Sequence, residues 1–101
     1  MNPTPRSAYP QLARLFKAYV NQDFDTFGPD PLDAVRAYAG DVRPATRAAA
    51  VAELDRLLAT TKGEAALDAA LDALKCGYLP SAAGSTARAF LRAVKATLTA
   101  P

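Results

Sequence analysis

Several residue types that enzymes and metal sites depend on are missing or scarce in this sequence. It contains no histidine and only one cysteine, Cys76. Histidine is the commonest general base and the usual partner of a catalytic serine or cysteine, so most hydrolase mechanisms lack their central residue. One cysteine cannot form an internal disulfide, and a zinc site would have to be built from carboxylates alone. We therefore predict that the protein is not an enzyme and has no catalytic residue, no metal site and no cofactor.

Long apolar runs are also absent. No window approaches the roughly 18 uninterrupted apolar residues of a membrane-spanning helix, and the N-terminal residues lack the apolar core of a signal peptide. We expect a cytoplasmic protein without a membrane partner. A length of 101 residues allows one domain, residues 1–101, and its segment 1–8, which contains two prolines, is expected to be a loose tail.

The apolar residues that are present favour helices. Of 51 such residues, 24 are alanine and 12 are leucine, whereas isoleucine and tryptophan are missing. Alanine and leucine have favourable helix propensities, and the β-branched residues that favour strands are few. The fold class is therefore predicted to be all-α.

Apolar residues recur every three or four positions in five stretches, which predicts five short helices. We expect these helices over residues 9–21, 31–39 and 44–60, from Thr61 to Gly77, and from Ser85 to the end of the chain. Because the connecting loops are short, a compact antiparallel bundle is expected, with the order of packing left open.

The expected helix boundaries carry recognisable cap residues. Asp30, which precedes a proline, is typical of an N-cap, and Gly40 is typical of the position just past a helix end. Thr61 and Glu64 have the spacing of a capping box, in which each side chain accepts a hydrogen bond from the backbone of the other. Ser85 is expected to cap the last helix.

Charge is divided unevenly along the chain, although the net charge is only +2. Residues 21–41 hold five aspartates and one arginine, and they include a loop in which Asp23 and Asp25 flank Phe24, with Phe27 close behind. Paired carboxylates could mark a metal or acid–base site, but no third ligand follows at a fixed spacing, so capping and solvation are favoured. The two phenylalanines are expected either to anchor a partner or to fold onto the core.

Two later segments each place like charges on one helix face. The acidic stripe, which fits a solvated face or a docking surface for a basic partner, consists of Glu64, Asp68 and Asp72. The basic stripe, which could follow a phosphate backbone, consists of Arg88, Arg92 and Lys95. Three residues are fewer than most nucleic-acid sites use, so direct nucleic-acid binding is not expected.

Two sequence blocks carry a resemblance to a known family. The first is Tyr9-Pro10-x-Leu12-x-x-Leu15-Phe16-x-x-Tyr19-x-x-Gln22-Asp23-Phe24-Asp25, followed by Pro31-Leu32-Asp33-Ala34-Val35. The second is Cys76-Gly77-Tyr78-x-Pro80-x-x-x-Gly84, which leads into Phe90-Leu91. With both blocks in this order, the chain resembles bacterial contact-dependent growth inhibition immunity proteins over nearly its whole length. It departs from their pattern at Phe24 and Phe90, where tryptophan is common, and in being mildly basic.

The resemblance implies a partner and a role. Members of that family are small helical cytoplasmic proteins that bind and neutralise the C-terminal toxin domain delivered by a neighbouring cell. For this chain it implies a complex with a cognate toxin domain, expected to be a nuclease held in a 1:1 heterodimer. A nuclease must present a basic cleft, and an acidic surface can steer toward that cleft and either cover it or bind beside it.

The candidate toxin-binding residues are the acidic side chains of the middle segments and the two loop phenylalanines: Asp23, Phe24, Asp25, Phe27, Asp30, Asp33, Glu64, Asp68 and Asp72. The alternative function is a small helical adaptor or nucleic-acid-binding regulator that uses the basic stripe.

Overall fold

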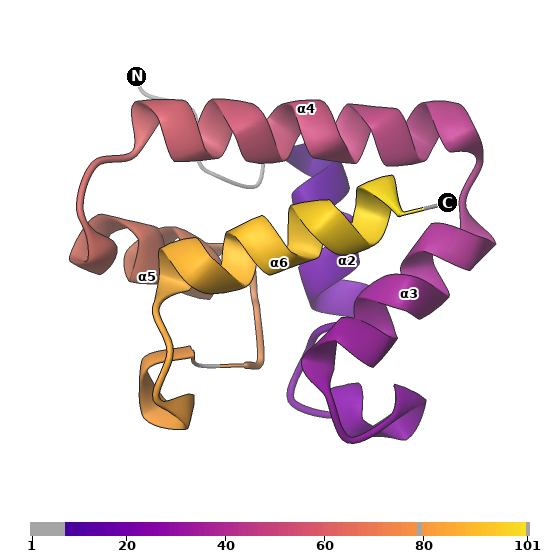
Figure 1. Ribbon diagram of the computed structural model, residues 1–101, viewed down its shortest axis with the longest axis horizontal. Helices are drawn as coiled ribbons and strands as arrows, with labels where there is room; N and C mark the ends of the chain where they lie inside the picture. The colour runs from indigo at the N-terminus through magenta and orange to yellow at the C-terminus, as the bar shows by residue number, and fades with distance from the viewer. Residues whose placement is uncertain (1–7, 79, 101) are drawn as a thin grey trace.

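The helix-favouring composition produces a helical protein. The computed structural model describes residues 8–78 and 80–100, and within them it contains five α-helices and two 3-10 turns but no β-strand (Figure 1). The helices are α2 (Pro10–Ala18), α3 (Pro31–Asp41), α4 (Pro44–Thr60), α5 (Glu64–Ala73) and α6 (Ala87–Thr99). The 3-10 turns are η1 (Phe24–Phe27) and η2 (Pro80–Ala83). The predicted all-α class is confirmed.

The last helix lies at the centre of the arrangement. α6 contacts α3, α4 and α5, and it runs antiparallel to the longest helix, α4 (Figure 1). α2 crosses behind this pair and packs on α4, while η1 lies against α3. This order of packing, which the sequence left open, puts α5 and η1 at opposite sides of the molecule in Figure 1.

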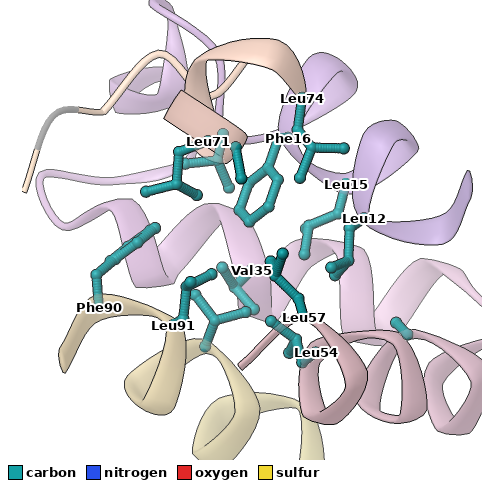
Figure 2. Close-up of a cluster of buried hydrophobic side chains, with 14 of the residues drawn as sticks. Leu12, Leu15, Phe16, Val35, Leu54, Leu57, Leu71, Leu74, Phe90 and Leu91 are labelled. Atoms are coloured by element: carbon teal, nitrogen blue, oxygen red, sulfur yellow. The ribbon is translucent and has the colours of Figure 1, made fainter. Parts of the chain in front are cut away.

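The core forms where the apolar faces of all five helices meet. Large side chains from each helix point toward one another in Figure 2, and each of them is at most 6% exposed. Burying one such side chain contributes about 1.5–3 kcal/mol relative to leaving it exposed. The labelled members are Leu12, Leu15, Phe16, Val35, Leu54, Leu57, Leu71, Leu74, Phe90 and Leu91.

The start of α3 follows the sequence prediction, but its end does not. Asp30 is the N-cap, and its Oδ1 accepts a hydrogen bond from the Leu32 N–H at 2.9 Å. Gly40 does not terminate the helix. The helix continues to Asp41, where the Val42 N–H still bonds to the Tyr38 carbonyl oxygen at 3.1 Å. Gly40 is not among the glycines with positive φ, so it lacks the left-handed conformation that ends helices at glycine.

The predicted capping box at Thr61 and Glu64 is wrong. Gly63, with φ 88°, is the N-cap of α5, and no side chain of the described residues donates or accepts a capping hydrogen bond there. The Glu64 Oε2 instead accepts hydrogen bonds from the backbone N–H groups of Ala87 at 2.9 Å and Arg88 at 3.4 Å. A contact with a distant helix has therefore replaced the local one.

The predicted cap of the last helix is displaced by one residue. Thr86, not Ser85, is the N-cap of α6, because its Oγ1 accepts a hydrogen bond from the Ala89 N–H at 3.1 Å. Because Glu64 accepts from Ala87 and Arg88, three N–H groups at the start of α6 that have no partner within the helix each have a side-chain oxygen as acceptor.

A buried carboxylate serves the N-terminus of α2 in the same manner. Glu53, on α4, is only 6% exposed. Its Oε1 accepts hydrogen bonds from the backbone N–H groups of Gln11 at 2.9 Å and Leu12 at 3.1 Å. These groups have no partner within their own helix, and the negative charge faces the positive end of the helix dipole. Glu53 thus attaches the start of α2 to the middle of α4.

Most of the predicted tail, residues 1–7, lies outside the described residues. Ala8 is the exception, because its carbonyl oxygen accepts a hydrogen bond from Arg56 of α4. The guanidinium carbon of Arg56 also lies 5.0 Å from the centre of the Tyr9 ring, within cation–π range.

Candidate functional site

The acidic loop that the sequence singled out is folded into a short ordered turn. α2 ends before Val20, and η1 is closed by hydrogen bonds from the Phe24 N–H to the Asn21 carbonyl and from the Gly28 N–H to the Asp25 carbonyl. Gly28 has φ 144°, a conformation that other residues rarely adopt. The loop is therefore held in one shape by its backbone.

The two phenylalanines at the ends of η1 contact different aromatic side chains. The Phe27 ring stacks on Tyr19 with 5.5 Å between ring centres, and Tyr19 meets the buried Tyr38 edge-on at 5.5 Å. The Phe24 ring meets Tyr78 edge-on at 5.8 Å. Each phenylalanine thus ends a separate row of aromatic rings that leads into the core.

Their exposure differs. Phe24 is half-buried against the core, which is one of the two alternatives expected from the sequence. Phe27 remains 41% exposed and is the only exposed large apolar side chain in the described part of the protein. It is the better placed of the two to contact a partner.

Acidic side chains lie on the same turn as this phenylalanine and at both ends of the helix that follows it. Asp23 and Asp25 are exposed on the turn, and Asp30 is exposed at the start of α3. Asp41, at the end of α3, is exposed and accepts a hydrogen bond from the Tyr19 hydroxyl at 2.8 Å. We call the following residues the acidic turn surface: Asp23, Asp25, Phe27, Asp30 and Asp41.

Asp33 is less available than these residues for contact with a partner, because both of its carboxylate oxygens are already bonded. Its Oδ2 accepts from the Asp30 N–H at 3.2 Å, which completes a capping box at the start of α3. Its Oδ1 lies 2.6 Å from Arg36 Nη1 in a salt bridge. Asp33 therefore supports the turn, and its charge is partly neutralised.

The structure does not bring the acidic stripe of α5 to the same place. α5 and η1 lie on opposite sides of the molecule in Figure 1. The Glu64 carboxylate caps α6, and Asp68 is half-buried, with a buried Oδ1 that has no hydrogen-bond partner among the described residues. Only Asp72 is both exposed and free of such a structural contact within the described chain. The nine candidate residues thus separate into a turn cluster and a weaker α5 cluster.

A small depression lies between these clusters, where α2 and α5 end. It has a volume of about 420 Å³ and is lined by Lys17, Asn21, Gln22, Asp72, Lys75, Cys76 and Gly77. Lys17 and Lys75 line it together with Asp72, so positive charges share this depression with the Asp72 carboxylate. Periodicity along the sequence does not reveal this arrangement, because Lys17 lies in the last turn of α2 and Lys75 lies in the turn after α5.

Cys76 is held in a protected environment beside this depression. Its Sγ lies 3.3 Å from the Tyr78 carbonyl oxygen, to which the thiol donates. Burial raises the pKa of the Cys76 thiol from 9.0 to about 11, and the hydrogen bond to the Tyr78 carbonyl only partly opposes this. The thiol is therefore neutral and unreactive at physiological pH.

We expect two measurable consequences of the raised Cys76 pKa. At pH 8, iodoacetamide should modify the folded protein about 100-fold more slowly than the urea-unfolded chain, since the thiolate is scarcer in the folded state.

The neutral thiol also stabilises the folded state fully below pH 9, and this contribution, on the order of 2 kcal/mol, is lost as the pH rises from 9 to 11. Urea titrations of wild type and Cys76→Ala at pH 8 and 11 measure it. If wild type and Cys76→Ala lost the same free energy of unfolding between pH 8 and pH 11, the raised pKa of Cys76 would be contradicted.

The basic stripe on α6 is interrupted by an ion pair. The Lys95 Nζ lies 2.6 Å from Asp55 Oδ1 of α4, and Arg88 is half-buried. Of the three stripe residues, only Arg92 is exposed and has no ion pair with a described residue. This is a narrow surface for a phosphate backbone, which usually meets several basic residues.

Neither a metal cluster nor a membrane-spanning segment emerges from the described residues. No group of three or more cysteine or acidic side chains in residues 8–78 and 80–100 could hold a metal ion. None of the helices described is long and apolar enough to cross a membrane.

The fold and this surface define a class: a small all-α protein whose most distinctive exposed feature is an aromatic residue among aspartates. The family model described as CdiI immunity protein matches residues 8–98. The chain therefore belongs to the CdiI immunity protein family, and the resemblance found in the sequence is confirmed.

A solved structure is similar to the whole chain. It is a chain in the crystal structure of a CdiA-CT/CdiI complex from Y. kristensenii 33638, with a TM-score of 0.86 and 28% sequence identity. The match covers 97% of this chain and 100% of that one. A comparison with curated protein sequences found no match.

Proposed function

We propose that this immunity protein neutralises the C-terminal toxin domain of a contact-dependent growth inhibition system by binding it through the acidic turn surface. It acts in the cytoplasm, by binding alone, and forms a 1:1 complex. The proposal is supported by the family, and by the similar structure, which is that of a CdiA-CT/CdiI complex. The observation that carries the choice of surface is the exposure of Phe27 among four exposed aspartates.

The chemistry of this surface favours a basic partner. A large aromatic side chain that becomes buried can dominate the energy of an interface, while charges around it steer association and set specificity. A toxin that cleaves nucleic acid needs a basic surface to bind phosphates. We therefore propose a nuclease toxin whose basic cleft is covered, or flanked, by the acidic turn surface.

Co-expression tests this function. The toxin domain encoded beside the immunity gene is expressed with the wild-type protein or with a variant, and growth and co-purification are recorded. Wild type should restore growth and form a stable 1:1 complex by light scattering. Toxicity despite wild-type protein, together with no complex, would contradict the immunity function toward that toxin.

Charge reversal tests the surface. Asp25→Lys should weaken toxin binding about 10-fold at low salt, mainly through slower association, because it places a positive charge opposite a basic partner. Asp72→Lys is the matched control, since it makes the same change at an exposed site on α5. Affinity and association rates are measured by surface plasmon resonance at two salt concentrations. A larger loss for Asp72→Lys than for Asp25→Lys would assign the interface to α5 instead.

A further inference from the structure

Two side chains of the acidic turn surface, Phe27 and Asp41, are joined through Tyr19 into one connected unit. The exposed Phe27 ring stacks on Tyr19 with a tilt of 32°, and the Tyr19 hydroxyl donates to Asp41 Oδ2 at 2.8 Å. An aromatic face and a carboxylate are thereby placed beside each other on the surface, from segments far apart in the sequence. We call Phe27, Tyr19 and Asp41 the aromatic–carboxylate seat.

We propose that this seat receives an arginine side chain of the toxin domain, a step that rests on the proposed function. The guanidinium lies over the Phe27 ring and donates hydrogen bonds to the Asp41 carboxylate. A guanidinium stacks on aromatic faces through its planar charge and also matches the two oxygens of a carboxylate, whereas an ammonium is a compact and strongly hydrated charge. A seat that offers both an aromatic face and a carboxylate therefore favours arginine over lysine.

The charge of the seat argues against an apolar occupant. Asp41 would lose its hydration beneath an apolar side chain, with only the Tyr19 hydroxyl to compensate it. A guanidinium supplies both the charge and the donors that compensate this loss. Asp41 Oδ1 is not used in a hydrogen bond to any described residue, so it can accept one from a partner.

The seat is fixed before the partner arrives. Tyr19 rests edge-on against Tyr38, which is fully buried, so the ring cannot move inward. The backbone after Phe27 also packs closely on α3, because a Cβ at Gly28 would lie 2.3 Å from Asp33 Oδ2. A seat formed in advance avoids the entropy loss of ordering these side chains on binding.

The experiment uses the complex of this protein with its cognate toxin domain. Phe27→Leu retains an apolar side chain but removes the aromatic face, and Asp41→Asn retains an acceptor for Tyr19 but removes the charge. Each should weaken toxin binding about 5- to 20-fold, while Asp55→Asn, the same change at an exposed position on α4, should have no effect. Thermal unfolding by circular dichroism confirms that each variant is folded.

A double-mutant cycle then identifies the occupant. Each surface arginine and lysine of the toxin domain is replaced by alanine and measured against wild type, Phe27→Leu and Asp41→Asn. One arginine should show a coupling of at least 5-fold to both positions, because its two interactions are lost together. Coupling to a lysine alone would overturn the assignment of arginine.

The outcomes separate this inference from the proposed function. If wild type binds the toxin and Asp25→Lys weakens the complex, but Phe27→Leu and Asp41→Asn bind as wild type does, the seat is wrong and the proposed surface stands. If wild type does not bind the toxin domain, both are overturned.

Discussion

Replacement of Gly77 by alanine is expected to lower the free energy of unfolding by about 3 kcal/mol or more. A Cβ at this position would lie 2.0 Å from the backbone carbon of Asn21 and 2.0 Å from the backbone nitrogen of Gln22. Neither atom can rotate away as a side chain could. The clash would also separate the Gly77 N–H from the Val20 carbonyl, to which it donates at 2.7 Å. Urea unfolding followed by circular dichroism measures the loss.

Gly40→Ala is the control for this substitution. Gly40 lies inside α3, and a Cβ there would meet no atom within 4 Å. Alanine should therefore stabilise the helix by about 0.5–1 kcal/mol, because glycine is a poor helix former. If the two alanine variants changed stability in the same direction, the close approach at Gly77 would not be the cause.

The position of Gly77 also connects stability to the proposed surface. Asn21 and Gln22 lead directly into the acidic turn, so a displacement there moves η1 relative to Tyr19. The folded fraction of Gly77→Ala should consequently bind the toxin domain more weakly than wild type does. Gly77 stands in the second sequence block that carried the family resemblance, and this contact gives it a structural reason.

Local patterns in the sequence predicted the helices well. The expected helix over residues 44–60 has the observed bounds of α4, and the start of α3 follows from Asp30 and the proline after it. Apolar spacing and caps act within a few residues, so these features need no knowledge of the tertiary structure. The first helix is shorter than expected, since α2 ends at Ala18 and Val20 already belongs to the turn.

Contacts between distant residues could not be predicted in this way. Glu53 and Glu64 are ordinary acidic residues in the sequence, yet each caps the N-terminus of another helix. Asp41 joins the acidic turn surface through Tyr19, from which it is separated by 22 positions. No periodicity or spacing rule connects such pairs, because they depend on how the helices pack.

The dependence on helix packing also limits what the sequence predicts about the candidate site. The loop carboxylates and Phe27 were identifiable because they stand in one short segment of the sequence, and the structure leaves Asp23, Asp25 and Phe27 exposed there. The α5 stripe was a pattern of equal apparent strength, but Glu64 is occupied by α6 and Asp68 is half-buried. Helix spacing places residues on one face of their own helix and does not say what that face packs against.

Glu53→Ala is expected to lower the free energy of unfolding by about 3 kcal/mol, since hydrogen bonds to a charged acceptor contribute about 1.5–3 kcal/mol and their loss leaves buried N–H groups without a partner. Those groups belong to Gln11 and Leu12, at the start of α2, and Tyr19 follows the last residue of that helix. Glu53→Gln retains an acceptor and should lose only about 1 kcal/mol. Urea unfolding of both variants gives the two values.

Glu64→Ala provides the comparison that separates a buried cap from an exposed one. Glu64 makes the same type of contact at the start of α6, but it is an exposed residue, so water can replace the carboxylate there. Glu64→Ala should lower the free energy of unfolding by about 1 kcal/mol, well below the decrease expected for Glu53→Ala. Equal losses would mean that burial does not decide the strength of these caps. A larger loss for Glu53→Ala would identify the buried link between α4 and α2 as the stronger cap, and this link attaches to α4 the helix from which Tyr19 and the acidic turn follow.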